Sequence, residues 1–487
     1  MLLLLLFLLQ IAPTLQEPRN LLQEFLKSHV DFSIHPCDDF YSHVCPATKQ
    51  RDFVTSLGNI KKALIAENQK FYFGNEDVNM TKSKERASLL DEFMDSKEAI
   101  NFNQSHPDLH QKLVDLFPMT IDFASGFHLK RSKDRYLNLR NMYIGLWLET
   151  ISNIEMPVAD REIRVLYDEL KGAVRDEFMN TPWLINKNGS LEKFVKALDA
   201  LPLKTVADFQ EFSLETMVFF TRGIQDIRAS LTLPDVHANV LEAIHEAIVL
   251  SDLLEYFKEK QYEILPELGN LKSKMEFIGG FGSEIAFNYI LLTGVTTPVL
   301  LAYKTDFKSD LYGGVGTTLI HEIMHTFVFG RNDPSPLRVW GSNRTDCVRY
   351  QMKKTCRTFP TSVCSDATYT FEEDAADLAA YRIAWKSYEK TLSRESREVE
   401  EYERLDKKQL FFYAFPTLFC QKMNSVEGVE DTHSSHHHRI NSLMSQMKAF
   451  KEVFQCKPND RMMRNRSKHC VLFGEHAPQT KTHVVGE

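Results

Sequence analysis

Two histidines stand four residues apart at His321 and His325, and Glu322 directly follows the first of them. In a helix, positions i and i+4 lie on one face, so both imidazoles would point toward a single ion. Nitrogen ligands at about 2.0–2.1 Å are typical of zinc, and a glutamate beside the metal can take a proton from zinc-bound water. Because a chain with 17 histidines can contain this spacing by chance, the prediction of a zinc site depends on a third ligand.

The best candidate for that ligand stands in residues 370–381, an alanine-rich stretch that favours a helix. Within it, Glu373 and Asp377 are four residues apart, and two like charges at that spacing repel unless a cation lies nearby. We therefore predict that Glu373 binds the metal and that Asp377 accepts the free N–H of a liganding imidazole. An acidic, solvated first helical turn is the alternative, and it would be favoured for this stretch taken alone.

The two motifs together resemble those of the neprilysin family of zinc endopeptidases. Residues 36–45 are similar to the family's PC-x-D-F signature, residues 312–325 to its YGGIG…HExxH block, and residues 431–456 to its D-x-H-S…R…F…C run. The resemblance implies a mainly α (α+β), two-lobed fold of the gluzincin type, with a thermolysin-like catalytic lobe and a helical lid.

The same resemblance implies a role for each residue of the two motifs. One zinc ion per chain would be bound by His321, His325 and Glu373. Glu322 would be the general base of catalysis, and Asp377 would orient an imidazole. These roles agree with those that the spacing of the residues suggests.

The C-terminal run implies three more site residues by position. His433 would stabilise the oxyanion of the tetrahedral intermediate, Arg439 would hold a substrate carbonyl, and Asp431 would support His433. Peptide hydrolysis develops negative charge on the carbonyl oxygen, which needs such a donor, and an arginine fork can fix the peptide. A run of histidines at 436–438 follows His433, and such a cluster is also typical of a solvated loop, so these three receive no role.

Several positions depart from the family pattern. Thr326 stands where the family has glycine, and residues 470–473 replace a C-x-x-W motif. The nearest match to the substrate-strand motif NA-x-[FY] offers Asn288, which could hold a peptide backbone by strand addition or could be an ordinary strand-end residue. The stretch between Cys45 and His321 is also short for a full lid, so the lid is expected to be reduced.

The first residues of the chain suggest a compartment. Residues 2–9 are all apolar, which fits the core of a secretory signal peptide, here residues 1–16, and is well short of the roughly 20 residues of a spanning helix. No other stretch is apolar enough to cross a bilayer. The expected location is therefore extracellular. Five glycosylation sequons, which begin at Asn79, Asn103, Asn188, Asn343 and Asn465, are permissive in a secreted protein.

Eight cysteines, an even number, suit an oxidising compartment. A structural zinc site is the alternative, but the thiols lack paired C-x-x-C spacing. The family resemblance implies three disulfides and leaves the last two cysteines as a local pair. The pairs are Cys37–Cys456, Cys45–Cys420, Cys347–Cys470 and Cys356–Cys364.

Length and charge set the remaining bounds. The net charge of −8 argues against a nucleic-acid partner. Apolar residues recur at helical spacing in residues 163–174 and 191–198, which predicts two helices with plain core faces. Residues 17–75 and 260–487 are expected to form the catalytic lobe, and residues 76–259 the reduced lid.

These features together predict a secreted zinc endopeptidase that cleaves internal bonds of short peptides. A different class competes with it, namely a catalytically idle zinc-binding relative that sequesters peptides or protein partners. The short lid and the departures at Thr326 and Asn288 favour the idle relative. The complete set of expected ligands, base and oxyanion donor favours the enzyme, because an idle site needs neither base nor donor.

Overall fold

The computed structural model describes residues 21–47, 81–122, 128–133, 135–137, 139–140, 157–186, 189–205, 208, 214–259, 281–284, 289–292, 308–328, 342–360, 364–392, 406–420 and 433–474. Most of these residues lie in helices, and the strands form two small sheets. The mainly α prediction is therefore confirmed. Among the described helices, none combines the length and the apolar composition that crossing a membrane would require.

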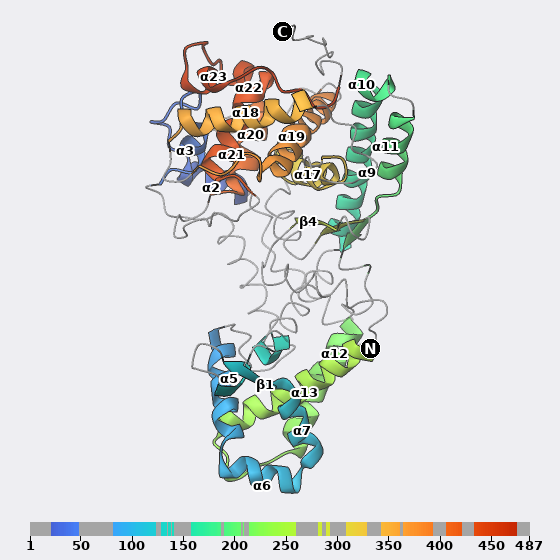
Figure 1. Ribbon diagram of the computed structural model, residues 1–487, viewed down its shortest axis with the longest axis vertical. Helices are drawn as coiled ribbons and strands as arrows, with labels where there is room; N and C mark the ends of the chain where they lie inside the picture. The colour runs from blue at the N-terminus through green and yellow to red at the C-terminus, as the bar shows by residue number, and fades with distance from the viewer. Residues whose placement is uncertain are drawn as a thin grey trace, which may run out of the picture.

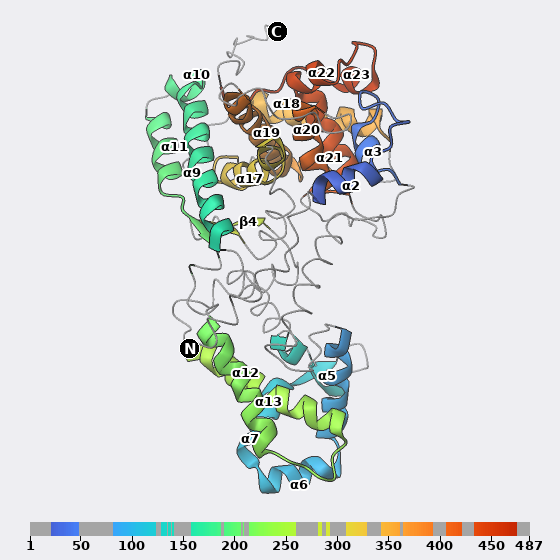
Figure 2. The same cartoon turned by 180° about the vertical axis from the view of Figure 1, so that it is seen from behind.

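The described helices gather into two bodies at opposite ends of the long axis of the molecule (Figures 1 and 2). Each body has its own buried apolar core. Among its described elements, the small body contains the hairpin of β1 (Met119–Asp122) and β2 (His128–Arg131) and the helices α5 (Thr81–Met94), α6 (Lys97–Ser105), α7 (Pro107–Leu116), α12 (Leu214–Ser230) and α13 (Ala238–Glu259).

The large body holds the motifs that the sequence singles out. Its elements, in chain order, are α2 (Leu21–His29), α3 (Phe40–Val44), α9 (Pro157–Met179), α10 (Pro182–Ile185), α11 (Ser190–Asp199), α16 (Lys308–Leu311), the π-helix η4 (Tyr312–Gly316), α17 (Thr317–His325), α18 (Ser342–Thr358), α19 (Phe371–Leu392), α20 (Lys407–Thr417), α21 (His436–Gln446), α22 (Lys448–Val453) and α23 (Arg461–Asn465).

A three-stranded sheet has the order β3 (Leu203–Thr205), β5 (Tyr289–Leu292), β4 (Phe281–Glu284). The central strand runs parallel to β3 and antiparallel to β4. Successive side chains of a strand point to opposite faces, and here Ile290 packs in the core of the large body while Tyr289 packs in that of the small body. Strand β5 thus contributes to both cores.

The division into bodies differs from the expected lid of residues 76–259. Helices α9, α10 and α11 and strand β3 share the core of the large body, with Leu170 and Phe194 fully buried in it. The segments before and after them, α5–α7 and α12–α13, form the small body. The expected lid span is therefore not one packing unit.

Helices α17 and α19 pack closely against each other in the middle of the large body. Helix α17 is buried on nearly all sides. Its buried apolar residues are Leu319, Ile320, Ile323 and Met324. Helix α19 presents small residues over the same stretch, including Ala375, Ala376, Ala379 and Ala380, all of them buried. Small side chains let two helix axes approach closely. This pair of helices carries the two predicted metal-binding motifs.

Four disulfides join the same cysteines as the pairing that the family resemblance implies. They are Cys37–Cys456, Cys45–Cys420, Cys347–Cys470 and Cys356–Cys364. Between the first two bridges, Phe40 is fully buried against Tyr413, Phe450 and Phe454. The N-terminal arm is thereby part of the large body, although the rest of that body lies far along the chain.

Candidate metal centre

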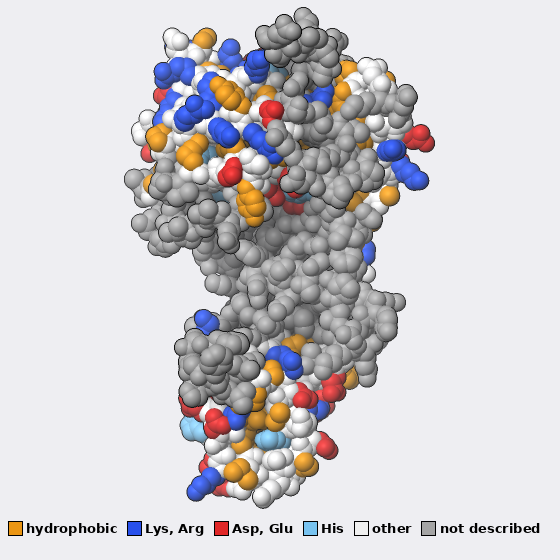
Figure 3. All heavy atoms as spheres, viewed as in Figure 1, with side chains coloured by type: hydrophobic (Ala, Val, Ile, Leu, Met, Phe, Trp, Pro, Cys, Tyr) orange, Lys and Arg blue, Asp and Glu red, His pale blue; other side chains and the backbone are white. Residues whose placement is uncertain are grey.

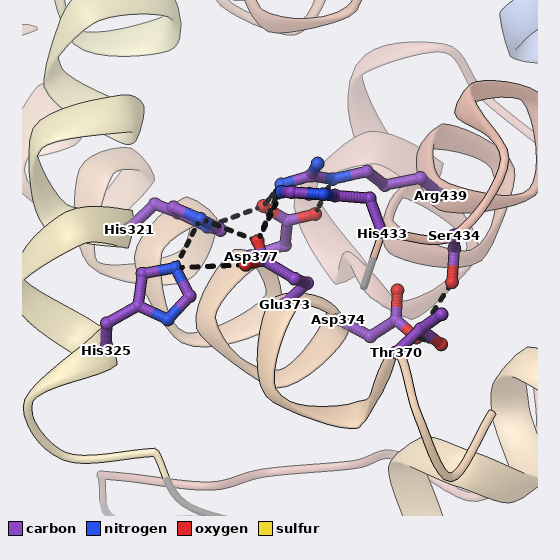
Figure 4. Close-up of polar contacts among 9 residues, drawn as sticks. All are labelled: His321, His325, Thr370, Glu373, Asp374, Asp377, His433, Ser434 and Arg439. Atoms are coloured by element: carbon purple, nitrogen blue, oxygen red, sulfur yellow. Dashed lines mark hydrogen bonds and ion pairs between the residues drawn. The ribbon is translucent and has the colours of Figure 1, made fainter. Parts of the chain in front are cut away.

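The two histidines of the HExxH motif and Glu373 converge between α17 and α19 (Figure 4). The Nε2 atoms of His321 and His325 are 3.0 Å apart. Glu373 Oε2 lies 3.1 Å from His321 Nε2, and Glu373 Oε1 lies 3.4 Å from His325 Nε2. One ligand atom from each residue lies within 4.8 Å of the other two.

These separations fit a zinc ion. Ligand atoms about 2.1 Å from a tetrahedral zinc ion are about 3.4 Å from one another. The closest approaches between the three residues are 3.0 to 3.4 Å, with a different carboxylate oxygen of Glu373 facing each histidine, and two imidazoles with one carboxylate form a donor set that zinc commonly takes. Burial opposes ionisation of Glu373, but contacts with His321 and His433 hold its pKa far below the usual range. The carboxylate is therefore charged and ready to bind a cation.

Asp377 lies one turn after Glu373 on α19 and is almost fully buried. Its Oδ1 is 2.8 Å from His321 Nδ1, on the side of the ring away from the other ligands. Burial opposes ionisation of Asp377, but the charges of Arg439 and His321 lower its pKa to about 2. Burial likewise opposes protonation of His321, yet Asp377 and Glu373 raise the pKa of the ring to about 10. A charged Asp377 keeps a proton on Nδ1 and leaves Nε2 facing Glu373.

Arg439 reaches the same place from α21. Its guanidinium donates to both carboxylate oxygens of Asp377, with Nη2–Oδ1 at 2.9 Å, and Nη2 lies 3.6 Å from Glu373 Oε2. Only 7% of the Arg439 side chain is exposed. Arg439, which is expected to hold a substrate carbonyl, thus donates its hydrogen bonds to Asp377 in this structure.

His433 stands just before α21, and its Nε2 is 3.2 Å from Glu373 Oε2. Its side chain is 43% exposed, in contrast to the buried residues around it. The figure shows His433 and Arg439 reaching toward Glu373 side by side (Figure 4). A histidine in this position can meet a group that enters from solvent. Glu322, on α17, is itself largely buried.

Comparison with known proteins places these residues in a family. Residues 290–470, which include α17, α19 and α21, match the family model described as peptidase family M13. Neprilysin-1 of Caenorhabditis elegans is 27% identical over 224 residues, and endothelin-converting enzyme-like 1 of Homo sapiens is 29% identical over 195 residues. Over residues 290–470 the chain therefore resembles the neprilysin family of peptidases. The matches cover 41% and 37% of this chain, but only 29% and 24% of those relatives.

Solved structures show the fold of this chain. The zinc metalloprotease Zmp1 of Mycobacterium tuberculosis, in complex with an inhibitor, aligns over 90% of this chain and 98% of its own, with a TM-score of 0.50 and 11% identity. The Haemonchus galactose containing glycoprotein complex aligns over 92% and 97%, with a TM-score of 0.54 and 11% identity. The two-lobed, gluzincin-type fold that the resemblance implies is thus confirmed.

Two other expected residues of the family pattern, Asn288 and Asp431, lie outside the described residues.

The three histidines without an expected role, at 436–438, have partners elsewhere in the fold. His436 packs against Phe419, His437 contacts the carboxylate of Asp39, and His438 Nε2 is 2.7 Å from the carbonyl oxygen of Phe359.

Asp374 is a site residue that the sequence patterns missed. Its Oδ2 accepts hydrogen bonds from Thr370 Oγ1 at 2.8 Å and from Ser434 Oγ at 3.0 Å (Figure 4). Burial raises the pKa of Asp374 to about 7. The spacing of Thr370 and Asp374 by one helical turn is a signal in the sequence, but the contact with Ser434, next to His433, is visible only in the fold.

Proposed function

We propose that this chain is a zinc-dependent endopeptidase that hydrolyses internal bonds of short peptides. The observation that carries the proposal is the convergence of His321, His325 and Glu373, whose closest nitrogen and oxygen atoms approach one another to 3.0 to 3.4 Å, with Asp377 hydrogen-bonded to His321 behind them. These three residues would hold one zinc ion, which when bound would polarise the scissile carbonyl and activate water. Membership of peptidase family M13 supports the same chemistry.

The other residues of the site transfer protons or stabilise charge. Glu322 accepts a proton from the attacking water and later delivers it to the leaving amine. His433 donates a hydrogen bond to the carbonyl oxygen as that oxygen becomes negative. Its exposure and its place 3.2 Å from Glu373 support this role. Arg439 keeps Asp377 charged. A guanidinium N–H of Arg439 that is not bonded to Asp377 donates to the backbone of the substrate.

The proposed site of action is extracellular. Four disulfides suit an oxidising compartment. The expected signal peptide, residues 1–16, lies outside the described residues.

Exchange of the base for its amide tests the proposal. Glu322→Gln keeps the size of the side chain and removes the proton acceptor, so zinc content should stay at one per chain while cleavage of a mixed peptide library falls by about 10²-fold or more. Glu372→Gln is the matched control, because Glu372 is an exposed neighbour of Glu373 on α19. The Glu372→Gln control should cleave the peptides at the rate of the wild type. A chelator should stop cleavage by the control and by the wild type.

Other outcomes would contradict the proposal in distinct ways. A Glu322→Gln variant that kept most of its activity would show that another group is the base. Absence of metal after gentle purification would remove the whole assignment. A wild type that bound zinc and peptides without cleaving any of them would be the catalytically idle relative.

A further inference from the structure

Lysine and arginine side chains gather on one outer face of the large body, over α18, α22 and α23 (Figure 3). Residues 342–360 and 448–469 together contain twelve Lys or Arg and three Asp or Glu. The whole chain has a net charge of −8. Positive charge is therefore concentrated here against the overall balance. We call seven of these residues the basic face: Lys353, Lys354, Arg357, Arg461, Arg464, Arg466 and Lys468.

The basic face is held on a firm framework. Helices α18 and α23 pack together, and Lys354 Nζ donates to the backbone oxygen of Arg466 at 2.8 Å. The guanidinium of Arg461 donates to the backbone oxygen of Thr358 and lies 4.4 Å from the centre of the Phe359 ring. The disulfide Cys347–Cys470 fastens the chain at the end of the face. The charges are thus fixed relative to one another along α18.

These charges are not neutralised within the fold. In the part of the chain that the structure describes, none of the seven residues forms an ion pair with Asp or Glu, whereas Lys386 and Lys390 on α19 both do. Lys353 and Arg357 are exposed one helical turn apart, where like charges repel. A cluster of uncompensated cations on a rigid surface favours an anionic partner.

One of the sequons next to the basic face is buried in the fold. Asn465, in the sequence Asn465-Arg466-Ser467, is fully buried, and its Nδ2 donates to Thr355 Oγ1 at 3.0 Å and to Ser445 Oγ at 3.2 Å. In the folded chain, the amide of Asn465 that would carry a sugar is therefore part of the core.

We infer that the basic face binds a sulfated polysaccharide. Its exposed arginines, Arg357 on α18 and Arg464 on α23, offer planar donor forks that suit the oxygens of sulfate groups, and the two packed helices spread the charges over a surface that suits a linear chain. The disulfides favour an oxidising compartment, where intracellular nucleic acids are not the partner. A membrane surface would favour several large apolar side chains among the charges. Among the described residues of the two segments, Tyr350 is the one exposed large hydrophobic side chain.

Binding to immobilised heparin, measured against salt concentration, tests this inference. The wild type should bind at about 0.15 M salt, and its affinity should fall steeply as salt rises. The triple variant Lys353→Glu, Arg357→Glu, Arg464→Glu should bind at least tenfold more weakly. Each lost ionic contact lowers the slope of log K against log salt by about one, so the slope should fall by about three. None of these residues belongs to the metal centre, so zinc content and cleavage should not change.

The matched control reverses three exposed lysines elsewhere: Lys97→Glu, Lys193→Glu, Lys196→Glu. It changes the net charge by the same amount and should bind heparin like the wild type. The melting temperature of each variant is measured, and the glutamine forms of the three face substitutions replace any glutamate variant that fails to fold. Equal losses in the face and control variants would overturn the inference. So would a wild type that ignores heparin but binds vesicles of phosphatidylserine.

Discussion

At the scale of single residues, the hydrogen bond between Ser434 and Asp374 joins two parts of the proposed catalytic site. Ser434 directly follows His433, and Asp374 directly follows Glu373. The contact between their side chains, 3.0 Å long and buried, fastens the segment of His433 to the helix that carries Glu373. It therefore sets the position of His433, the proposed oxyanion donor, relative to the proposed metal ligands.

Removal of the Ser434 hydroxyl should weaken catalysis more than binding. Loss of an oxyanion donor costs about 10²–10³ in kcat, and loss of its positioning should cost less, about tenfold for Ser434→Ala. The effect should appear in kcat with little change in KM, because the donor acts mainly in the transition state. Steady-state kinetics and zinc content on the same preparation check this.

Thr370→Val provides the control for that variant. Thr370 Oγ1 donates to the same Asp374 oxygen, but Thr370 stands directly before α19, on the same chain segment as Asp374, and so does not link that helix to the segment of His433. Its loss should change kcat by less than the loss of the Ser434 hydroxyl. Equal effects of the two variants, or an effect of Ser434→Ala confined to KM, would show that the contact is merely structural.

Sequence patterns locate residues of the site only where helical spacing brings them together. His321 with His325, and Glu373 with Asp377, are each one turn apart, and the structure places all four around one point. Contacts between distant segments are beyond such patterns. The pairing of Arg439 with Asp377 and that of Ser434 with Asp374 join residues about sixty positions apart, so only the packing of α21 on α19 reveals them.

At the scale of elements, the short π-helix η4 sets the position of α17. It leads directly into the helix with the two histidines, and its residues are buried. Gly313 within it lies against the backbone of α20, so that a Cβ atom there would overlap the carbonyl oxygen of Phe411. Backbone atoms cannot rotate away as a side chain can. The absence of a side chain at Gly313 is thus a condition for the close packing of η4 on α20.

Gly313→Ala should therefore push η4 and α17 away from α20. Overpacking of this kind costs about 1–3 kcal/mol of unfolding free energy, and displacement of His321 and His325 should also lower zinc affinity. Chemical denaturation and a zinc titration measure the two effects. Gly172→Ala is the control, since it lies inside α9 with no atom within 4 Å of the added Cβ. It should stabilise by about 0.5–1 kcal/mol. Similar destabilisation by both variants would contradict this account of η4.

The sequence predicts which faces of the helices are buried but not which core they enter. Ile163, Leu170 and Val174, from one predicted face of α9, and Phe194 and Leu198 of α11 are buried as expected. Apolar periodicity reports only that a face avoids water. It carries no information on the partner, so the sequence places α9 and α11 in the lid, whereas α9 packs beside α17 and α19, and α11 packs on α9.

At the scale of the whole molecule, two nested disulfides tie the start of the large body to its end. Cys37–Cys456 and Cys45–Cys420 close loops with sequence separations of 419 and 375 residues. The two bridges are not independent. While one is intact, the other closes a much shorter path, which contains 8 residues from Cys37 to Cys45 and 36 from Cys420 to Cys456.

This nesting predicts that the losses of the two bridges are not additive. In the chain-entropy account, replacing either cysteine pair by serine costs about 4 kcal/mol, because the remaining bridge still restrains the unfolded chain. Replacing the second pair then frees the full loop and costs about 6 kcal/mol, so the quadruple variant should lose about 2 kcal/mol more than the two single losses combined. Chemical denaturation of the three variants measures these terms, and the secreted yield should fall in the same order. Strictly additive losses would show that the bridges restrain separate parts of the chain. Peptide mapping that joined Cys37 to Cys45 would disprove the arrangement itself, since the N-terminal arm would then be free of the catalytic helices.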